Sequence, residues 1–265
     1  MDVGALRGMA RTALRRHAPQ RWLFKRRHDV TGPHGLPAAP WANAVLQHQS
    51  QVAASLAQLR TLGLPPAPDA PKNWDALAAL DLILASTRRT ARIFDAGGEH
   101  YSMILPWLWL YGYRNLIAGN LAFATRTTLG PIVYEHADIT HTRYPDGFFD
   151  AVTCLSVIEH GVDLRRYFQE MSRIIAPGGL LITSTDYWET PVDTRGQCAY
   201  GVPIRVFTRP EIVAALELAR SFDFELLAEP DLGVTERVVH WQPYDLRYTF
   251  VIFSLRKQRR RPRSA

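Results

Sequence analysis

The 265-residue sequence has few cysteines and no long apolar run. Its two cysteines, Cys154 and Cys198, are too few for the disulfide framework of a small secreted domain. No run approaches the ~18 apolar residues that a membrane-spanning helix needs. The most apolar central stretch, Met103–Tyr113, is short and contains Pro106. The basic N-terminus lacks the apolar core and cleavage site of a secretory signal. We therefore expect a cytoplasmic protein without a transmembrane segment.

The net charge of +6 is unevenly distributed. Residues 1–28 hold eight Arg or Lys and one acid, and residues 256–263 hold six Arg or Lys and no acid. Residues 29–255 therefore carry a net charge of −7. Basic ends on an acidic body are either solvated tails or contacts with nucleic acid or an anionic surface. The apolar residues among the N-terminal arginines fit a helix lying on a membrane surface, and they fit equally an arm docked on the protein itself.

Composition divides the chain into four parts. We expect a basic arm and linker over residues 1–40, a helical extension or cap over 41–90, an α/β domain over 91–257 and a basic tail over 258–265. In the extension, apolar spacing predicts a helix over 41–62. A second predicted helix runs to about Ser86, with Asn73 or Asp75 as its N-cap.

In the α/β domain, short apolar runs alternate with helical patterns. The predicted strands are Arg92–Asp95, Asn115–Asn120, Ile132–His136, Phe149–Ser156, Leu180–Thr185, Phe224–Ala228 and Tyr248–Leu255. A helix is predicted over 163–176, ended by Gly178 and Gly179. Another starts at Thr208 with Glu211 completing a capping box. This alternation predicts a mostly parallel sheet with helices on both faces, closed by one antiparallel strand.

Polar or glycine residues follow five consecutive predicted strands. In an open α/β sheet, ligands bind outside the carboxyl ends of the strands. The segments that meet there are Phe94–Gly98, Gly119–Asn120, His136–Thr140, Ser156–Gly161 and Ser184–Trp188. The fingerprint G-x-G-x-x-G is absent after the first strand, which argues against a nicotinamide-dependent oxidoreductase.

One run of the sequence resembles a known family. It reads Phe149-Asp150-Ala151-Val152, then Glu159-His160, then Glu170-Met171-Ser172-Arg173-Ile174 and Pro177-Gly178-Gly179. The pattern is similar to that of class I methyltransferases, in particular the small-molecule type 11 group. The resemblance covers residues 92–190 and implies a Rossmann-like, seven-stranded sheet of order 3-2-1-4-5-7-6 with S-adenosylmethionine as methyl donor.

The resemblance also implies the donor site. Asp95, Gly97 and Gly98 match the residues that hold the methionine part of the donor, and Ser156 lies after the fourth strand. Asp138 matches an acid that accepts the adenine amino group, and Ile139 would pack on the adenine ring.

Two positions depart from the family pattern. Glu99 and Tyr101 replace the later glycines of the first loop, and Asn120 replaces the acid that grips the ribose hydroxyls. An amide oxygen is a neutral substitute for that carboxylate.

Methyl transfer to an alcohol or phenol requires a base, because the hydroxyl proton must leave. His160 is the predicted base, since it follows the fourth strand and titrates near neutrality. Asp186, at the end of the fifth strand, is predicted to orient the imidazole or to stabilise its charge. His160 lining the pocket without catalysis is the alternative. Glu135 and His136 alternate to opposite faces of a strand, so no metal site is expected.

The sequence does not identify the acceptor of the methyl group. We expect O-methylation of a small hydroxylated acceptor, such as a sugar or a glycan end. Aromatic residues after the fifth strand and before the last are candidates for stacking on that acceptor or for lid packing, namely Tyr187, Trp188, Tyr200, Trp241 and Tyr244. The alternatives are an RNA or protein methyltransferase that uses the basic termini, and a non-catalytic scaffold of the same fold. The termini also suggest a peripheral location at a membrane surface.

Overall fold

The computed structural model describes residues 18–259, which are built around one ten-stranded sheet. Its strands are β1 (Ala44–Val45), β2 (Arg92–Ala96), β3 (Asn115–Asn120), β4 (Thr127–Leu129), β5 (Ile132–His136), β6 (Phe149–Leu155), β7 (Ile175–Tyr187), β10 (Phe224–Leu226), β11 (Val239–Trp241) and β12 (Leu246–Lys257). A separate hairpin joins β8 (Cys198–Ala199) to β9 (Val202–Pro203).

The strand order confirms the predicted α/β, Rossmann-like fold. Along the sheet it is β1-β12-β7-β6-β2-β3-β5-β4, and β10 and β11 also pair with β12. Strands β2, β3, β5, β6 and β7 are parallel, and β12 runs antiparallel to β7. The seven expected strands are all present in the order 3-2-1-4-5-7-6. The short strands β1, β4 and β11 were not expected, and they bring the sheet from seven strands to ten.

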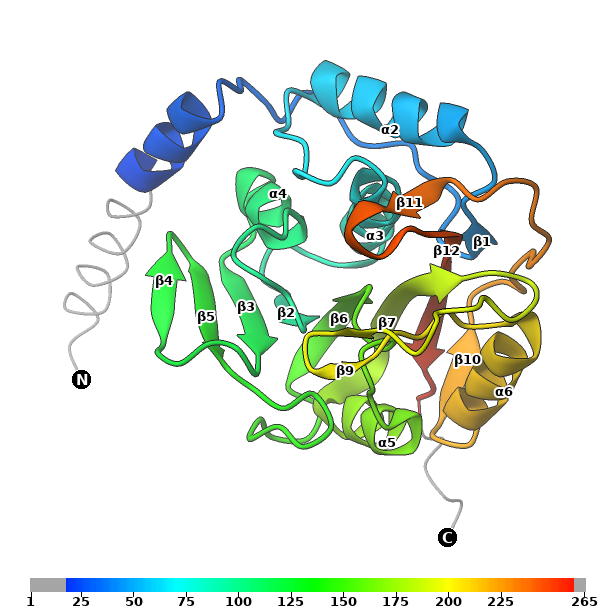
Figure 1. Ribbon diagram of the computed structural model, residues 1–265. Coiled ribbons are helices and arrows are strands. Elements are labelled where there is room, and N and C mark those ends of the chain that lie inside the picture. The colour runs from blue at the N-terminus through cyan, green and yellow to red at the C-terminus, as the bar shows by residue number, and fades with distance from the viewer. Residues whose placement is uncertain (1–17, 260–265) are drawn as a thin grey trace, which may run out of the picture.

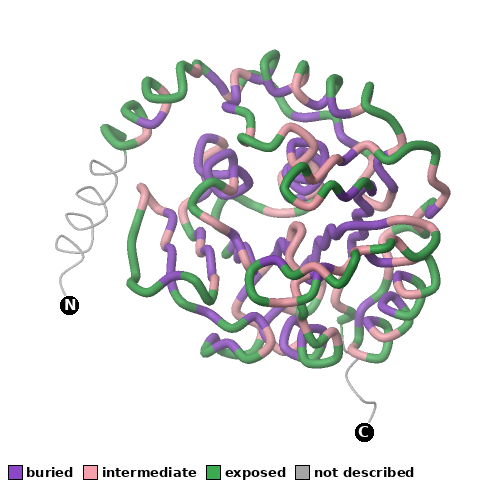
Figure 2. The backbone as a smooth tube through the Cα atoms, in the orientation of Figure 1, coloured by how far each residue is buried: buried purple, intermediate pink, exposed green. Residues whose placement is uncertain are grey.

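Helices cover both faces of the sheet (Figure 1). They are α2 (Gln49–Leu62), α3 (Lys72–Ser86), α4 (Ile104–Leu110), α5 (Leu164–Ile174) and α6 (Arg209–Arg220), with a 3-10 turn η1 (Gln242–Tyr244). Helices α3 and α4 lie on one face with α2 outside them, and α5 and α6 lie on the other. Residues 18–27 are also helical. The strands run through the buried centre, and exposed residues gather on the outer sides of the helices (Figure 2).

Two hydrophobic cores lie on opposite faces of the sheet. Ile93 belongs to the core under α2, α3 and α4, whereas the next residue, Phe94, belongs to the core under α5 and α6. Ala151 and Val152 divide in the same way. This follows from the alternation of side chains along a strand. Both faces are apolar, so polar side chains of these strands are concentrated at the strand ends.

Part of the predicted helix 41–62 is wrong. Ala44 and Val45 form β1 and pair with Ile252 and Val251 of β12. The helix α2 begins only at Gln49, after a capping box at His48. Val251 and Ile252 pair with β7 on one side, and β10 pairs only with the end of β12, so β1 pairs with these two residues on the other side. This pairing outweighs the helical periodicity of the segment.

The ends of the other helices show two further corrections. Helix α5 ends at Ile174, and Gly178 and Gly179 lie within β7 rather than at a helix C-cap. A Cβ atom on Gly179 would lie 2.8 Å from the Asp150 carbonyl oxygen, so the glycine allows this close approach of β6 and β7. Asn73 lies inside α3 and does not cap it, whereas the predicted capping box of α6 at Thr208 is confirmed.

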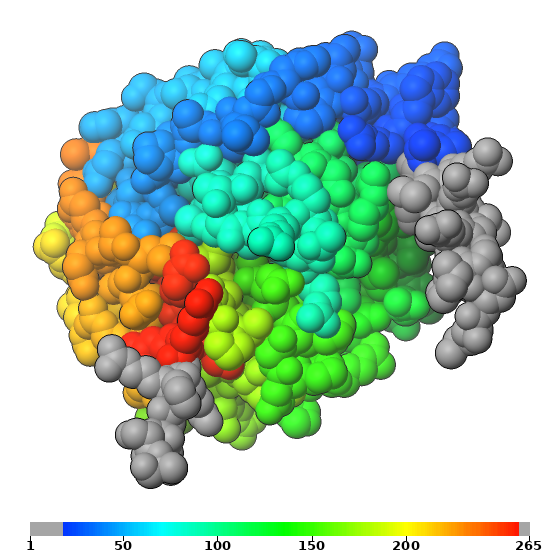
Figure 3. Space-filling view, turned by 180° about the vertical axis from the view of Figure 1, so that it is seen from behind, coloured from blue at the N-terminus to red at the C-terminus, as the bar shows by residue number. Residues whose placement is uncertain are grey.

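The N-terminal extension packs along the α/β domain (Figure 3). In the helix over residues 18–27, Phe24 is buried and its ring centroid lies 5.6 Å from that of Trp109 in α4. No helix within residues 18–259 is long and apolar enough to cross a membrane. The sequence predictions for residues 1–17 and 260–265 lie outside the described residues.

An ion pair between buried Glu170 and partly exposed Arg173 joins the loop after β5 to α5. The Glu170 carboxylate accepts hydrogen bonds from Thr142 N at 2.7 Å and Thr142 Oγ1 at 2.6 Å. Arg173 donates to the same carboxylate at 2.6 Å and to the Tyr144 carbonyl oxygen at 2.7 Å. Burial alone would raise the pKa of Glu170, but the hydrogen bonds from Arg173 and Thr142 outweigh it and lower the pKa.

Replacing Arg173 tests this contact. The substitution Arg173→Leu leaves Glu170 buried without its partner, so we expect urea unfolding to show a loss of about 2–3 kcal/mol at pH 7. The loss should shrink as the pH falls through the lowered pKa of Glu170, because a protonated carboxyl no longer needs the cation. The control Arg220→Leu removes surface pairs with Glu217 and Glu229 and should cost under about 1 kcal/mol. Equal losses in the two variants would contradict the interpretation.

Candidate functional site

The predicted site residues all lie at one edge of the sheet. They follow the carboxyl ends of β2, β3, β5, β6 and β7, which are parallel and adjacent. The strand order reverses between β2 and β6, which makes this edge the place where an open α/β sheet binds its ligand.

The turn after β2 brings its backbone close to two neighbours. Gly97 has φ +83°, and its N–H donates to the Gly119 carbonyl oxygen at 2.7 Å. A Cβ atom on Gly98 would lie 2.1 Å from Asp95 Oδ2, so only glycine fits there. Asp95 is buried and accepts a hydrogen bond from Thr153 Oγ1 at 2.7 Å. Burial raises the pKa of Asp95 to about 7.

Asn120 at the end of β3 is bonded to that turn. Its Nδ2 donates to the Gly97 carbonyl oxygen at 2.9 Å and to Glu99 Oε1 at 3.0 Å. Its Oδ1 accepts from Ala122 N at 2.9 Å. The side chain therefore joins β3 to the glycine turn.

Asp138 and Ile139 follow β5, and the first is exposed whereas the second is buried. Asp138 is exposed, and its Oδ1 accepts hydrogen bonds from Thr140 N at 2.8 Å and Thr140 Oγ1 at 2.7 Å. Ile139 is buried. The pair thus offers a carboxylate oriented by a turn beside an apolar side chain, as the adenine prediction requires.

Ser156 contains a buried hydroxyl that lacks a partner. Its Oγ makes no hydrogen bond with any of the described residues, while its N–H donates to the Ser184 carbonyl oxygen at 3.0 Å. Its φ of +52° is unusual for a residue other than glycine. A buried polar atom without a partner is costly. A bound polar ligand at the β2–β6 reversal would supply one, which fits the donor that the sequence predicts there.

His160 lies in the loop after β6, half-buried. Its ring packs edge to face against the ring of Tyr200, with centroids 5.1 Å apart. Tyr200 is 78% exposed. Burial and the nearby charge of Lys72 both lower the pKa of His160, so its imidazole is a free base at neutral pH.

Asp186 at the end of β7 has different neighbours from those expected. Its buried side chain forms hydrogen bonds with Glu159 and Tyr248. Glu159 also accepts a hydrogen bond from Thr185 Oγ1 at 2.9 Å. Burial and the charge of Glu159 raise the pKa of Asp186 well above its usual value. An orienting hydrogen bond from Asp186 to His160 stays a prediction.

Lys72 lies near these groups, and the sequence suggested only that residues 72–75 close over the donor. It begins α3, and its ammonium group lies 4.5 Å from the centroid of the Phe250 ring. Burial alone would lower the pKa of Lys72, but the charges of Asp186, Glu159 and Asp75 outweigh it and raise the pKa. Asp75 accepts a hydrogen bond from Ser184 Oγ. Lys72 is thus the cation that faces the buried carboxyl groups and His160.

The sequence contained a signal for one of the two residues whose place in the site was missed. Glu159 is part of the Glu159-His160 pair, but only the histidine received a role. Lys72 stands at the start of a predicted helix, and no periodicity shows which strand end it faces. The remaining predicted polar cluster is structural, because Glu135 accepts hydrogen bonds from Tyr144 at 2.6 Å and Arg126 at 3.0 Å.

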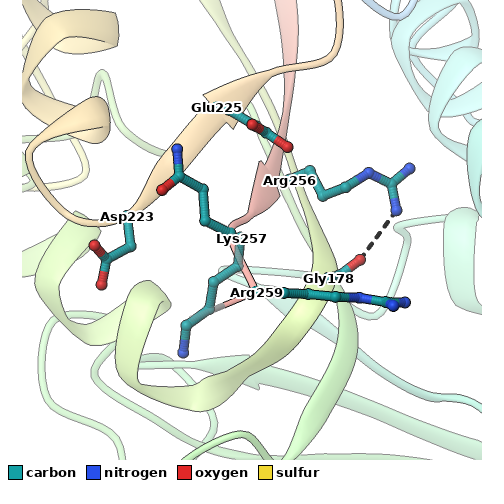
Figure 4. A pocket seen from close by; sticks show the side chains of 7 residues that line it. Gly178, Asp223, Glu225, Arg256, Lys257 and Arg259 are labelled. Carbon is teal, nitrogen blue, oxygen red and sulfur yellow. Dashed lines mark hydrogen bonds between the residues drawn. The ribbon is translucent and has the colours of Figure 1, made fainter. Parts of the chain in front are cut away.

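A cavity of about 620 Å³ lies elsewhere, at the opposite edge of the sheet (Figure 4). Its lining includes Gly178 and Arg256, and Arg256 donates to the Gly178 carbonyl oxygen at 3.0 Å. Lys257 donates to the Ile175 carbonyl oxygen at 2.8 Å. Because Arg256 pairs with Leu180, near the amino end of β7, this cavity is separate from the predicted site.

Comparison with known proteins identifies the domain. The family described as a methyltransferase domain matches residues 114–183. The tRNA U34 carboxymethyltransferase of Campylobacter curvus is 30% identical over 115 residues, which cover 40% of this chain and 37% of that protein. The match therefore spans little more than a third of the length of this curated relative.

Solved structures of low sequence identity share the fold. Geranyl diphosphate C-methyltransferase from Streptomyces coelicolor A3(2) has a TM-score of 0.52 and 16% identity, covering 90% of this chain and 92% of that chain. The 1,6-didemethyltoxoflavin-N1-methyltransferase from Burkholderia thailandensis has a TM-score of 0.51 and 17% identity, covering 86% of this chain and 100% of that chain. Both contain S-adenosylhomocysteine. Residues 114–183 thus match a methyltransferase domain, and the chain has the fold of class I S-adenosylmethionine-dependent methyltransferases.

Proposed function

We propose that this protein transfers a methyl group from S-adenosylmethionine to a hydroxyl oxygen of a small acceptor, such as a sugar or a glycan end. The observation that carries the proposal is the environment of His160. A half-buried imidazole with a lowered pKa lies at the carboxyl edge of the sheet, beside an exposed aromatic ring. A hydroxyl acceptor needs such a base, whereas transfer to a neutral amine nitrogen can begin without one.

The donor would be held by the turn after β2 and the ends of β5 and β6. Gly97 and Gly98, shaped by Asp95, allow the backbone to approach the methionine part. Asp138 would accept the adenine amino group beside Ile139, and the Ser156 hydroxyl would gain its missing partner. These assignments agree with the chemistry of each group.

The reaction requires two actions from the protein. When bound, the donor supplies an electrophilic methyl group on a sulfonium. The protein must hold the acceptor hydroxyl in line with that methyl group. His160 Nδ1 or Nε2 then accepts the hydroxyl proton as the oxygen–methyl bond forms. Asp186 would assist through Lys72 and Glu159, as a positioning residue.

The acceptor class is supported by the exposed rings around His160. Tyr200 and Tyr101 are 78% and 63% exposed, and an exposed aromatic face can cover the apolar face of a sugar or stack on an aryl ring. Two other aromatic residues that the sequence suggested for stacking on the acceptor already have partners within the protein. Tyr187 is buried with its hydroxyl donating to the Leu232 carbonyl oxygen, and Arg237 covers the Trp188 ring. These two therefore serve packing.

The basic arm suggests a second contact, and we propose that it binds an anionic membrane surface. The described part of the arm, residues 18–27, contains four Arg or Lys and no acid. Trp22 and Leu23 are 57% and 56% exposed, while Phe24 is buried against the domain. Basic residues beside exposed Trp and Leu are typical of helices that lie in a lipid interface.

The donor and the base are tested together. Calorimetry should show that wild-type protein binds S-adenosylhomocysteine, and His160→Ala should bind it equally well. With a panel of methyl glycosides, oligosaccharides and phenols, His160→Ala should reduce release of S-adenosylhomocysteine about 10²- to 10⁴-fold. The control His141→Ala, at an exposed histidine, should retain turnover. Full turnover of His160→Ala would contradict the base, and absent wild-type binding would contradict the donor.

The influence of Lys72 on His160 has a direct readout. Replacing Lys72 with Met removes a nearby positive charge, so the pKa of His160 should rise. Nuclear magnetic resonance titration of the imidazole measures this, and the acidic limb of the activity profile should move to higher pH in parallel. The control Lys25→Met, in the arm, should leave the titration unchanged. An unchanged or lowered pKa in Lys72→Met would contradict the electrostatic link.

The arm is tested with lipid vesicles. Wild-type protein should sediment with vesicles containing anionic phosphatidylserine and remain free with neutral phosphatidylcholine, and salt should weaken the binding. Combined Trp22→Ala and Leu23→Ala substitutions should reduce binding at least several-fold. Leu36→Ala, which removes an exposed leucine outside the helix, is the matched control. Unchanged vesicle binding in the double variant, or binding to tRNA in place of vesicles, would contradict the membrane contact.

A further inference from the structure

The side chain at the end of β3 is largely engaged within the protein. Asn120 Nδ2 donates to the carbonyl oxygens of Gly97 and Gly98 and to the carboxylate of Glu99, at 2.9, 3.4 and 3.0 Å. Its Oδ1 accepts from Ala122 N. An amide oxygen can accept two hydrogen bonds, so Oδ1 has one acceptor site left. Asn120 can therefore accept one hydrogen bond from a ligand but not a pair.

The ribose of the proposed donor carries two adjacent hydroxyl groups. Both are hydrogen-bond donors, and a carboxylate is the strongest acceptor for such a pair. The engagement of Asn120 means that this acceptor must come from another residue near the ends of β2 and β3.

Glu99 is the carboxylate at that position. It follows Gly98 in the turn, its side chain is half exposed, and Oε1 lies 3.0 Å from Asn120 Nδ2. Its backbone N–H donates to Ser102 Oγ at 2.9 Å, which fixes the residue in the turn.

Two other acids of the predicted donor site are less suited to this role. Asp95 is buried, with one oxygen bonded to Thr153 and the other packed against Gly98. Asp138 is exposed but lies beyond β5, where the proposed function assigns it the adenine amino group. Glu99 alone among these three combines exposure with a position between β2 and β3.

We infer that Glu99 accepts the ribose hydroxyls of the donor and that Asn120 orients its carboxylate. The acid and the neutral residue have exchanged places relative to the pattern that the sequence resembles: the acid lies in the glycine turn and the amide at the strand end. Asn120 is a positioning residue in this arrangement. The inference rests on the proposed binding of S-adenosylmethionine.

The test pairs variants with a ligand that lacks the hydroxyls. Calorimetry would compare S-adenosylhomocysteine with its 2′,3′-dideoxy analogue in wild-type protein and in Glu99→Gln. We expect Glu99→Gln to weaken S-adenosylhomocysteine about tenfold or more, the loss typical of a hydrogen bond to a charged group. Binding of the dideoxy analogue should be equal in the two proteins. The matched control Glu225→Gln, at the opposite edge, should bind both ligands as wild type does.

A double variant and thermal unfolding complete the test. Glu99→Gly combined with Asn120→Asp returns the acid to the strand end, and it should recover most of the lost affinity. If Glu99→Gln weakens both ligands equally, or weakens neither, the assignment of Glu99 is overturned while the proposed donor still stands. Thermal unfolding of each variant shows whether a loss of affinity reflects misfolding. If Glu99→Gln misfolds, the affinity of the double variant decides whether the assignment of Glu99 holds. A wild-type protein that binds neither ligand would overturn the proposed donor and this inference with it.

Discussion

The burial of two neighbouring carboxyl groups, Glu159 and Asp186, is the main electrostatic constraint on this edge of the sheet. Burial raises the pKa of both groups, and the nearby charge of Lys72 acts in the opposite direction. Burial and the same cation lower the pKa of His160. Because Lys72 begins α3, this charge comes from the helical extension. The extension therefore takes part in the electrostatics of the site.

The apolar cores explain why this edge is available for chemistry. Strands β2 and β6 alternate between two hydrophobic cores, so their interiors contain few positions for ligand-binding groups. Groups that bind or react must then lie where the strands end. The glycine turn at Gly97 and Gly98, the unpartnered Ser156 hydroxyl and His160 all occupy such ends. The donor and the base can thus be neighbours although they are distant in the sequence.

The amino-acid sequence was sufficient to predict the seven main strands of the sheet and the edge at which the predicted site residues lie. Strand periodicity, the glycine turn and the Glu159-His160 pair are local signals, and each predicted site residue lies at the carboxyl edge. Long-range contacts were not predictable. Residues 44–45 join β12, some 200 positions away, and no local pattern contains that pairing. The contact of Lys72 with the Phe250 ring of β12 and the bond between Asn120 and Glu99 likewise depend on how distant segments meet. Propensity therefore predicted elements, while tertiary packing determined their partners.

The central claim is that a neutral histidine at this edge directs methyl transfer to oxygen. The most direct measurement uses S-adenosylmethionine labelled with ¹³C in its methyl group, incubated with the protein and hydroxylated acceptors. Nuclear magnetic resonance then identifies the atom that carries the label. The account predicts that the labelled carbon appears as a methoxy group and that none appears when His160 is replaced. Label on nitrogen or carbon, or a methoxy product that forms equally well without His160, would contradict it.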